Sequence, residues 1–252
     1  MEDKIRKEDL LIQAGVIAGN LFPTDIVKRD KYIQIQYYML SDDPAIRKKA
    51  IDLSIDLFNL DIDPANVSYD PSLNTAYDGN ASLDKNNYEK VKIAPNSFIV
   101  NEHNANTFET LNSRRSVGRF VTIIAHEIEH SKQLTVENKL FLFQHDEGRI
   151  MLEVEAYNST KLKSLSYGMT QAEYELEYNT PLNFMQAQIL NINEKNKELL
   201  ESPNYNFDCF YEQKSVGGWL TKNDGTQYWG LVSTSTLLDI YGNPIDHPPV
   251  YR

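Results

Sequence analysis

The segment Ser116–Gln133 constrains the fold more than any other part of the chain. Its large apolar residues recur at spacings of three and four, which is the period of an α-helix rather than the alternation of a strand. A helix with such a stripe needs other elements to cover it. We therefore predict a helix buried beneath a cleft, with an apolar stripe formed by Phe120, Val121, Ile124 and Ile128.

The texture of the chain changes along its length, which predicts an α+β fold. Residues up to about 60 indicate helices, and one of these begins at Asp43-Pro44. Residues 67–100 form short runs between Pro, Gly, Asn and Asp, which is typical of two or three strands. The last run, Val91–Pro95, contains a proline, so we expect it at the edge of a sheet.

Further helices and then a hairpin are expected after the central helix. The helices cover about 146–165, a segment that begins at Thr170 with Glu173 as its capping box, and about 180–201. A β-hairpin is expected over 216–231, around an Asp-Gly turn, with its aromatic side chains packed across the two strands. We thus expect an N-terminal helical region packed on the core at 1–64, the core and following helices at 65–202, and a β-rich tail at 203–252.

Charge and cysteine content exclude several classes of function. Thirty-six acidic against 25 basic residues give a net charge of −11, and no lysine- and arginine-rich run occurs, which disfavours binding to nucleic acid. Cys209 is the only cysteine, so neither an intramolecular disulfide nor a cysteine-based metal cluster can form. The apolar stretch Leu10–Ala18 is shorter than the ~20 residues of a membrane span, and we interpret it as an amphipathic helix. It is also a poor secretory signal, which leaves the compartment open, including secretion by a dedicated system.

The motif His126-Glu127-Ile128-Glu129-His130 points to a metal site. Two histidines four residues apart project from one face of a helix, so both imidazoles can reach a single Zn²⁺ at about 2.0–2.1 Å. Glu127 falls beside such a metal, where a carboxylate holds a water molecule without being a ligand. His126 and His130 are therefore candidate ligands of one zinc ion per chain, and Glu127 is the candidate general base.

This motif resembles that of the zincin metallopeptidases. In zincins an edge strand lines the substrate cleft, one helix carries HExxH and a later helix carries the third ligand. Val91–Ala94, Ser116–Gln133 and Asp146–Leu165 are similar to these parts, and the resemblance covers about residues 67–165. The glycine and third histidine of a metzincin do not follow His130. The resemblance is therefore to the gluzincins, which take a glutamate from the next helix.

The glutamate ligand implied by this resemblance lies in the run Leu152–Tyr157. Several gluzincin-like families carry Glu-x-x-Ala with the first glutamate as ligand, which implies Glu153, with Ala156 packed against the metal helix. Tyr157 departs from the acidic or amide residue usually found next. Two alternatives to Glu153 stay open, namely Glu155 and His145.

Such a site implies zinc-dependent hydrolysis of peptide bonds by a metal-activated water, with Glu127 as general base. A noncatalytic, metal-stabilised binding module and a hydrolase of nonpeptide amides remain alternatives. In organisation the chain is also similar to the peptidase toxin domains of bacterial polymorphic toxins and secreted effectors. That similarity implies a protein or peptide substrate and leaves room for a cognate immunity protein. A housekeeping or processing peptidase is the alternative. The donor that stabilises the oxyanion is open, and Tyr157 is either that donor or a packing residue.

Overall fold

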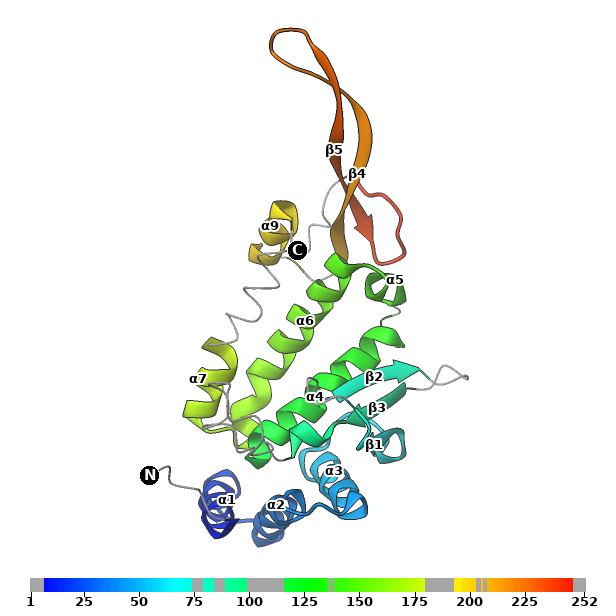
Figure 1. Cartoon of the computed structure of the whole chain (residues 1–252). Coiled ribbons are helices and arrows are strands. Elements are labelled where there is room, and N and C mark those ends of the chain that lie inside the picture. Colours follow the sequence, from blue (N-terminus) through cyan, green and yellow to red (C-terminus); the bar gives the residue numbers. More distant parts are fainter. Residues whose placement is uncertain are drawn as a thin grey trace. The chain divides into compact units, whose positions relative to one another are not determined.

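The structure is a computed structural model, and it describes residues 7–73, 79–83, 89–98, 116–135, 137, 139–179, 193–202, 205 and 208–246. The protein has mixed α and β structure with small sheets, as the sequence predicts (Figure 1). None of the helices within the described ranges is long and apolar enough to cross a membrane. The chain divides into two compact units, Met1–Glu137 with Ala156–Pro181 and Asn138–Glu155 with Leu182–Arg252.

The first unit begins with three helices, α1 (Lys7–Leu21), α2 (Ile26–Met39) and α3 (Pro44–Phe58). Helix α3 starts where the sequence predicts, because the Asp43 carboxylate accepts a hydrogen bond at 2.8 Å from the second helical N–H. It ends at Asn59, whose φ of 49° is left-handed. The three helices contribute the buried side chains Ala14, Ala18, Tyr32, Ile35, Met39, Ala50, Ile51, Ile55 and Leu57 to one core.

A small sheet follows, formed by β1 (Val67–Tyr69), β2 (Gly79–Leu83) and β3 (Glu89–Ile93) in the order β1-β3-β2. Strand β3 pairs parallel with β1 and antiparallel with β2. The prediction that Val91–Ala94 forms an edge strand is therefore wrong, since β3 lies at the centre of the described sheet. The prediction relied on Pro95, which lies outside the strand. The strand ends at Ile93 and Pro95 begins a 3₁₀ helix, so the missing N–H of the proline interrupts no hydrogen bond between strands.

Helix α4 (Val117–Leu134) packs against β2 and β3 and carries the motif (Figure 1). Helix α6 (Asp146–Ser164) is continuous, although its residues before Ala156 are grouped with the second unit and the later ones with the first. Helix α7 (Gln171–Asn179) begins with the predicted capping box, in which Thr170 Oγ1 accepts from Glu173 N at 3.2 Å and Glu173 Oε2 accepts from Thr170 N at 2.9 Å.

The second unit contains α5 (Leu140–Phe143), α9 (Glu194–Glu201) and a long hairpin of β4 (Cys209–Thr221) and β5 (Gln227–Asp239). The expected helix over 180–201 is described only as α9, and its first part lies outside the described residues. The hairpin is longer than the predicted 216–231 because its first residues join the core of this unit. That core consists of Leu142, Met151, Leu152, Leu199, Cys209, Phe210, Leu237 and Leu238.

Candidate metal centre

The start of α4 is fixed by side-chain hydrogen bonds, and its apolar stripe is buried. Ser116 Oγ accepts from Arg119 N at 3.2 Å and donates to Glu173 Oε2 at 2.9 Å, so α4 is tied to the beginning of α7. The predicted stripe is confirmed, because its side chains are at most 2 % exposed. The stripe consists of Phe120, Val121, Ile124 and Ile128.

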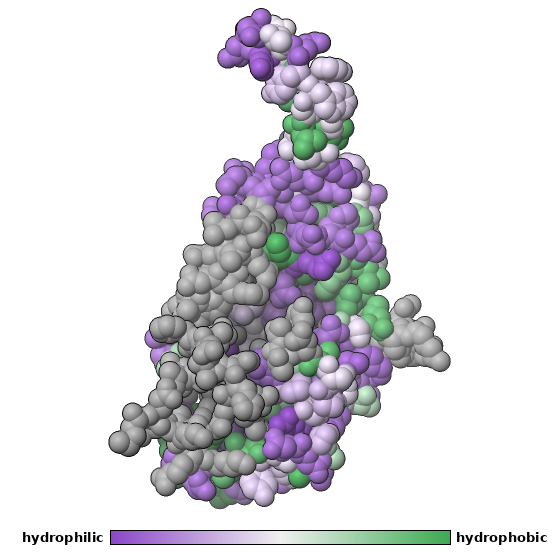
Figure 2. Space-filling view, in the orientation of Figure 1, coloured by the Kyte–Doolittle hydropathy of each residue, from purple (hydrophilic) through white to green (hydrophobic). Residues whose placement is uncertain are grey.

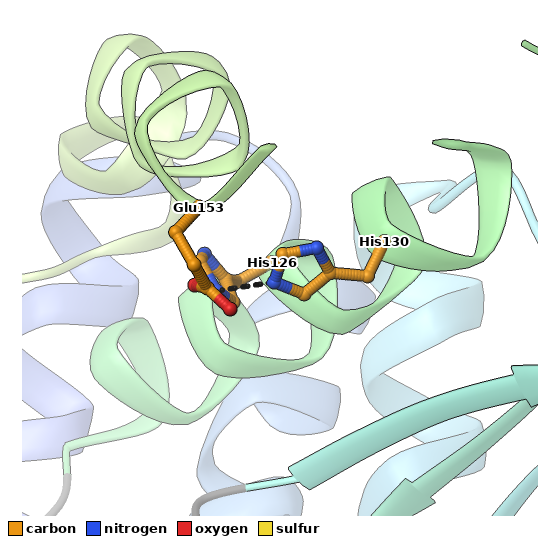
Figure 3. A group of neighbouring side chains, drawn as sticks. All are labelled: His126, His130 and Glu153. Atoms are coloured by element: carbon orange, nitrogen blue, oxygen red, sulfur yellow. Dashed lines mark hydrogen bonds between the residues drawn. The ribbon is translucent and has the colours of Figure 1, made fainter. Parts of the chain in front are cut away.

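The structure brings the three predicted ligands together (Figure 3). The Nε2 atoms of His126 and His130 lie 3.0 Å apart, and one ligand atom from each histidine and from Glu153 lies within 4.8 Å of the others. Two nitrogen ligands of a single tetrahedral zinc lie roughly 3.3 Å apart, given Zn–N bonds of about 2.0–2.1 Å. The spacing of the histidines therefore suits one metal ion.

Gln133 determines which nitrogen of His130 is available. Its Oε1 lies 2.9 Å from His130 Nδ1, and the Gln133 side chain is only 2 % exposed. An amide oxygen can only accept a hydrogen bond, so Nδ1 carries the proton and Nε2 of the neutral ring keeps its lone pair. Sequence reasoning missed Gln133, although its position three residues after His130 on one helix was a signal for contact.

Helix α6 supplies Glu153 and, one turn later, Tyr157. The Tyr157 ring meets the His126 ring edge-on, with centroids 5.2 Å apart. Since Glu153 and Tyr157 are separated by one helical turn, both point from α6 toward the same side. Ala156, between them, is fully buried, as expected for the small residue of the Glu-x-x-Ala pattern.

The two glutamates left open by the sequence have different partners. Both carboxylate oxygens of Glu155 accept hydrogen bonds from Lys139 Nζ, at 2.7 and 2.9 Å. Lys139 is only 4 % exposed, so this is a largely buried ion pair. Glu153, by contrast, lies with the histidines. The geometry thus favours Glu153 over Glu155 as the third ligand.

Glu127 lies beneath the start of β2 and is not part of the three-residue group. Its side chain is 7 % exposed. A Cβ added at Gly79 would lie 2.6 Å from Glu127 Cγ and 2.8 Å from Cδ, so strand backbone rests directly on this carboxylate. Sequence reasoning missed Gly79, for which the signal was a glycine in a strand, often the mark of a close approach.

His145, the other histidine among the described residues, does not join the group. His145 Nδ1 lies 3.5 Å from Glu212 Oε1, and its ring packs against Phe141 and Phe210. It therefore belongs to the packing of the second unit rather than to the candidate centre. His103 and His247, to which we assign no role, lie outside the described residues.

Helix α4 also carries a separate charge cluster. Lys132 Nζ lies 3.4 Å from Glu129 Oε1 and 3.3 Å from Asp61 Oδ2, beside a cavity of ≈ 220 Å³. Burial alone would lower the pKa of Lys132, but the two carboxylates outweigh it and raise the pKa above its usual value. Glu129 thus pairs with Lys132 and is not part of the three-residue group.

Comparisons with known proteins leave this geometry as the main guide to function. No family model, no curated protein and no solved structure matches the chain. The donor atoms of the site and their surroundings therefore indicate what it can do.

Proposed function

We propose that this chain is a zinc-dependent peptidase in which His126, His130 and Glu153 hold the metal and Glu127 is the general base. One observation carries the proposal: three ligand atoms of the kinds that zinc prefers converge within 4.8 Å. The carboxylate next to the first histidine is buried and stays outside the ligand group. Metal-assisted hydrolysis requires such an arrangement, in which the metal ligands and the general base are different residues.

The donor set fits zinc better than the common hard cations. Two imidazole nitrogens and one carboxylate oxygen form the three-ligand set of a catalytic zinc site, which keeps a fourth position open. Ca²⁺ and Mg²⁺ prefer oxygen ligands throughout. The hydrogen bond from His130 Nδ1 to Gln133 also leaves Nε2 deprotonated, as a metal ligand must be.

The residues around the metal group would then share the chemistry of amide hydrolysis. When bound, zinc supplies a Lewis acid that polarises the scissile carbonyl and acidifies water. Glu127 accepts a proton from the attacking water and passes it to the leaving amine. Packing of Gly79 against Glu127 limits the positions that this carboxylate can take, which keeps the base oriented.

Strand β2 is the element best suited to bind an extended substrate. It is an edge of the described sheet, and its first residue lies on Glu127. A peptide that added to this edge by main-chain hydrogen bonds would therefore pass the general base. This assigns to β2 the role that the sequence alone suggested for Val91–Ala94.

The decisive experiment separates catalysis from metal binding by one substitution. Glu127→Gln keeps the shape of the side chain but cannot accept a proton near neutral pH. We expect cleavage of a quenched-fluorescence peptide library to fall by about 10²–10⁴-fold, because general-base catalysis is lost. Zinc content, measured by mass spectrometry, should stay near one ion per chain.

Glu129→Gln is the matched control, since Glu129 lies on the same helix and pairs with Lys132 instead. Its activity should stay close to that of the wild-type protein. Wild-type cleavage rates for Glu127→Gln would contradict the peptidase mechanism. A zinc-loaded wild-type protein that cleaves no peptide would favour the noncatalytic binding module instead.

A further inference from the structure

The β4–β5 hairpin exposes a cluster of large apolar side chains in its distal half, Val216–Val232. Trp219, Trp229 and Leu231 are 66 %, 63 % and 71 % exposed. Green, apolar side chains are visible on the hairpin below its purple tip in Figure 2. The exposed apolar residues of the cluster are Val216, Trp219, Tyr228, Trp229, Leu231 and Val232.

These side chains occupy both faces of the two-stranded ribbon. Residues directly opposite in an antiparallel pair share a face, and successive pairs alternate between faces. The Trp219–Trp229 pair and Leu231, which is opposite Gly217, therefore lie on one face. The Val216–Val232 pair lies on the other face, as does Tyr228. A folded partner that packed on one face would leave the other in water.

The aromatic side chains lie close to the ribbon instead of projecting from it. The Trp219 and Trp229 rings meet edge-on with centroids 5.7 Å apart. A Cβ added at Gly217 would lie 2.8 Å from Cζ2 of Trp229, so this indole lies across the glycine. The pair thus forms a compact apolar block with polar ring N–H groups, the character of side chains at the boundary between water and lipid.

The charge of this segment differs from the net charge of the whole chain. Within Val216–Val232 the charged residues are Lys222 and Asp224, so one lysine and one aspartate give a net charge of zero. The whole chain carries −11. The Lys222 ammonium lies 5.6 Å from the centroid of the Tyr228 ring, at the tip. The distal half therefore carries none of the net negative charge that would repel anionic lipid headgroups.

We propose that the distal half of the hairpin, Val216–Val232, inserts into the interfacial layer of a lipid bilayer. The strand from Val216 to Thr221 is about 17 Å long at ~3.4 Å per residue, well short of the ~30 Å hydrocarbon core. The outer backbone edges of a two-stranded ribbon need water or headgroups as hydrogen-bond partners, so the hairpin stays in the hydrated layer. There, lipid surrounds both apolar faces at once.

The test uses intrinsic fluorescence, since Trp219 and Trp229 are the only tryptophans in the chain. The full chain is mixed with vesicles of phosphatidylcholine, alone or with phosphatidylserine, and assayed by flotation and tryptophan emission. We expect flotation, a blue shift and quenching by brominated lipid. Trp219→Thr with Leu231→Thr should weaken partitioning by at least about tenfold, because two apolar side chains are removed from one face. Threonine keeps the strand propensity, and Trp229 remains as reporter.

Ile12→Thr with Val16→Thr on α1 is the matched control, because these two side chains are 66 % and 61 % exposed. It should bind vesicles like the wild-type protein, and circular dichroism should show both double variants folded. Failure of the wild-type protein to float with either vesicle overturns the proposal. So does binding without a blue shift that is lost in high salt, which would reflect lysine contacts alone. A lipid-free dimer that the hairpin substitutions dissociate would assign the cluster to a second copy and also overturn it.

Discussion

At the scale of single residues, Glu153 and Glu155 show how two similar side chains on one helix acquire different roles. Two residues correspond to about 200° around a helix, so the two carboxylates leave α6 on different sides. Glu153 joins the histidines, and Glu155 neutralises the buried Lys139. We therefore propose that Glu153 is a metal ligand, whereas Glu155 stabilises the fold through its ion pair with Lys139.

This contrast predicts two distinct defects. Glu153→Ala should weaken zinc binding by more than about 100-fold, since even outer partners of a ligand are worth 10–100-fold. Glu155→Ala should keep zinc but lower the free energy of unfolding by roughly 3 kcal/mol, because the buried Lys139 ammonium loses the Glu155 carboxylate. Metal titration and urea unfolding of both variants measure the two effects. The reverse pattern would move the ligand to Glu155.

The candidate site was predictable from the sequence wherever its geometry is local. The spacing of His126, Glu127 and His130 fixes their relation on one helix, and Glu-x-x-Ala pointed to Glu153. Gly79 could not be predicted in the same way, because its position depends on pairing with Ile93 and on docking of α4 against β2. Long-range packing of this kind leaves little trace in residue spacing.

At the scale of elements, the contact between β2 and α4 makes a glycine part of the proposed catalytic arrangement. Gly79 is the first residue of β2, and the extended backbone of a strand accepts an alanine. Its surroundings would not, since the added Cβ would overlap Glu127 Cγ at 2.6 Å. Either the strand or the carboxylate must then move.

Gly79→Ala should therefore lower peptidase activity by on the order of 100-fold, the usual cost of displacing a reacting group by about 1 Å. Zinc content should be unchanged, because the ligands are not touched. Asn80→Ala is the control, since Asn80 is exposed on the opposite face of the same strand. Kinetics and metal analysis of both variants test the contact. Full activity of Gly79→Ala would show that this packing does not orient the base.

The hairpin and the sheet show which features of elements the sequence could specify. The Asp224-Gly225 turn was predictable because Gly225 has a φ of 83°, which favours glycine. The exposure of Trp219 and Trp229 was not predictable, since they form the expected cross-strand pair but no described element covers it. The predicted edge position of Val91–Ala94 was wrong for a related reason. The place of β3 in the sheet depends on the strands that pair with it rather than on its own residues.

At the scale of the whole molecule, the proposed metal should contribute to stability, because its three ligands come together only in the folded state and not in the unfolded state. Free zinc at 1,000 times its dissociation constant stabilises the folded state by about 4 kcal/mol. For a chain of this size that corresponds to a Tm shift of roughly 10 °C. Removal of zinc by EDTA should lower Tm by about this amount in thermal unfolding followed by circular dichroism.

The same measurement on His130→Ala provides the comparison, since this variant lacks one proposed ligand. Its Tm should be lower from the outset and should hardly respond to EDTA. An equal response of wild type and His130→Ala to the chelator would show that the metal is bound elsewhere.

The division of the chain also determines when the candidate centre can form during synthesis. The first unit needs Met1–Glu137 and then Ala156–Pro181, whereas the second needs Asn138–Glu155 and then Leu182–Arg252. A ribosome releases these segments in order from the N-terminus. A nascent chain that stops after Glu137 would present both histidines without the rest of their unit or Glu153. Capture of the proposed metal by all three candidate ligands would therefore be a late step in the biogenesis of this protein, after most of the chain has left the ribosome.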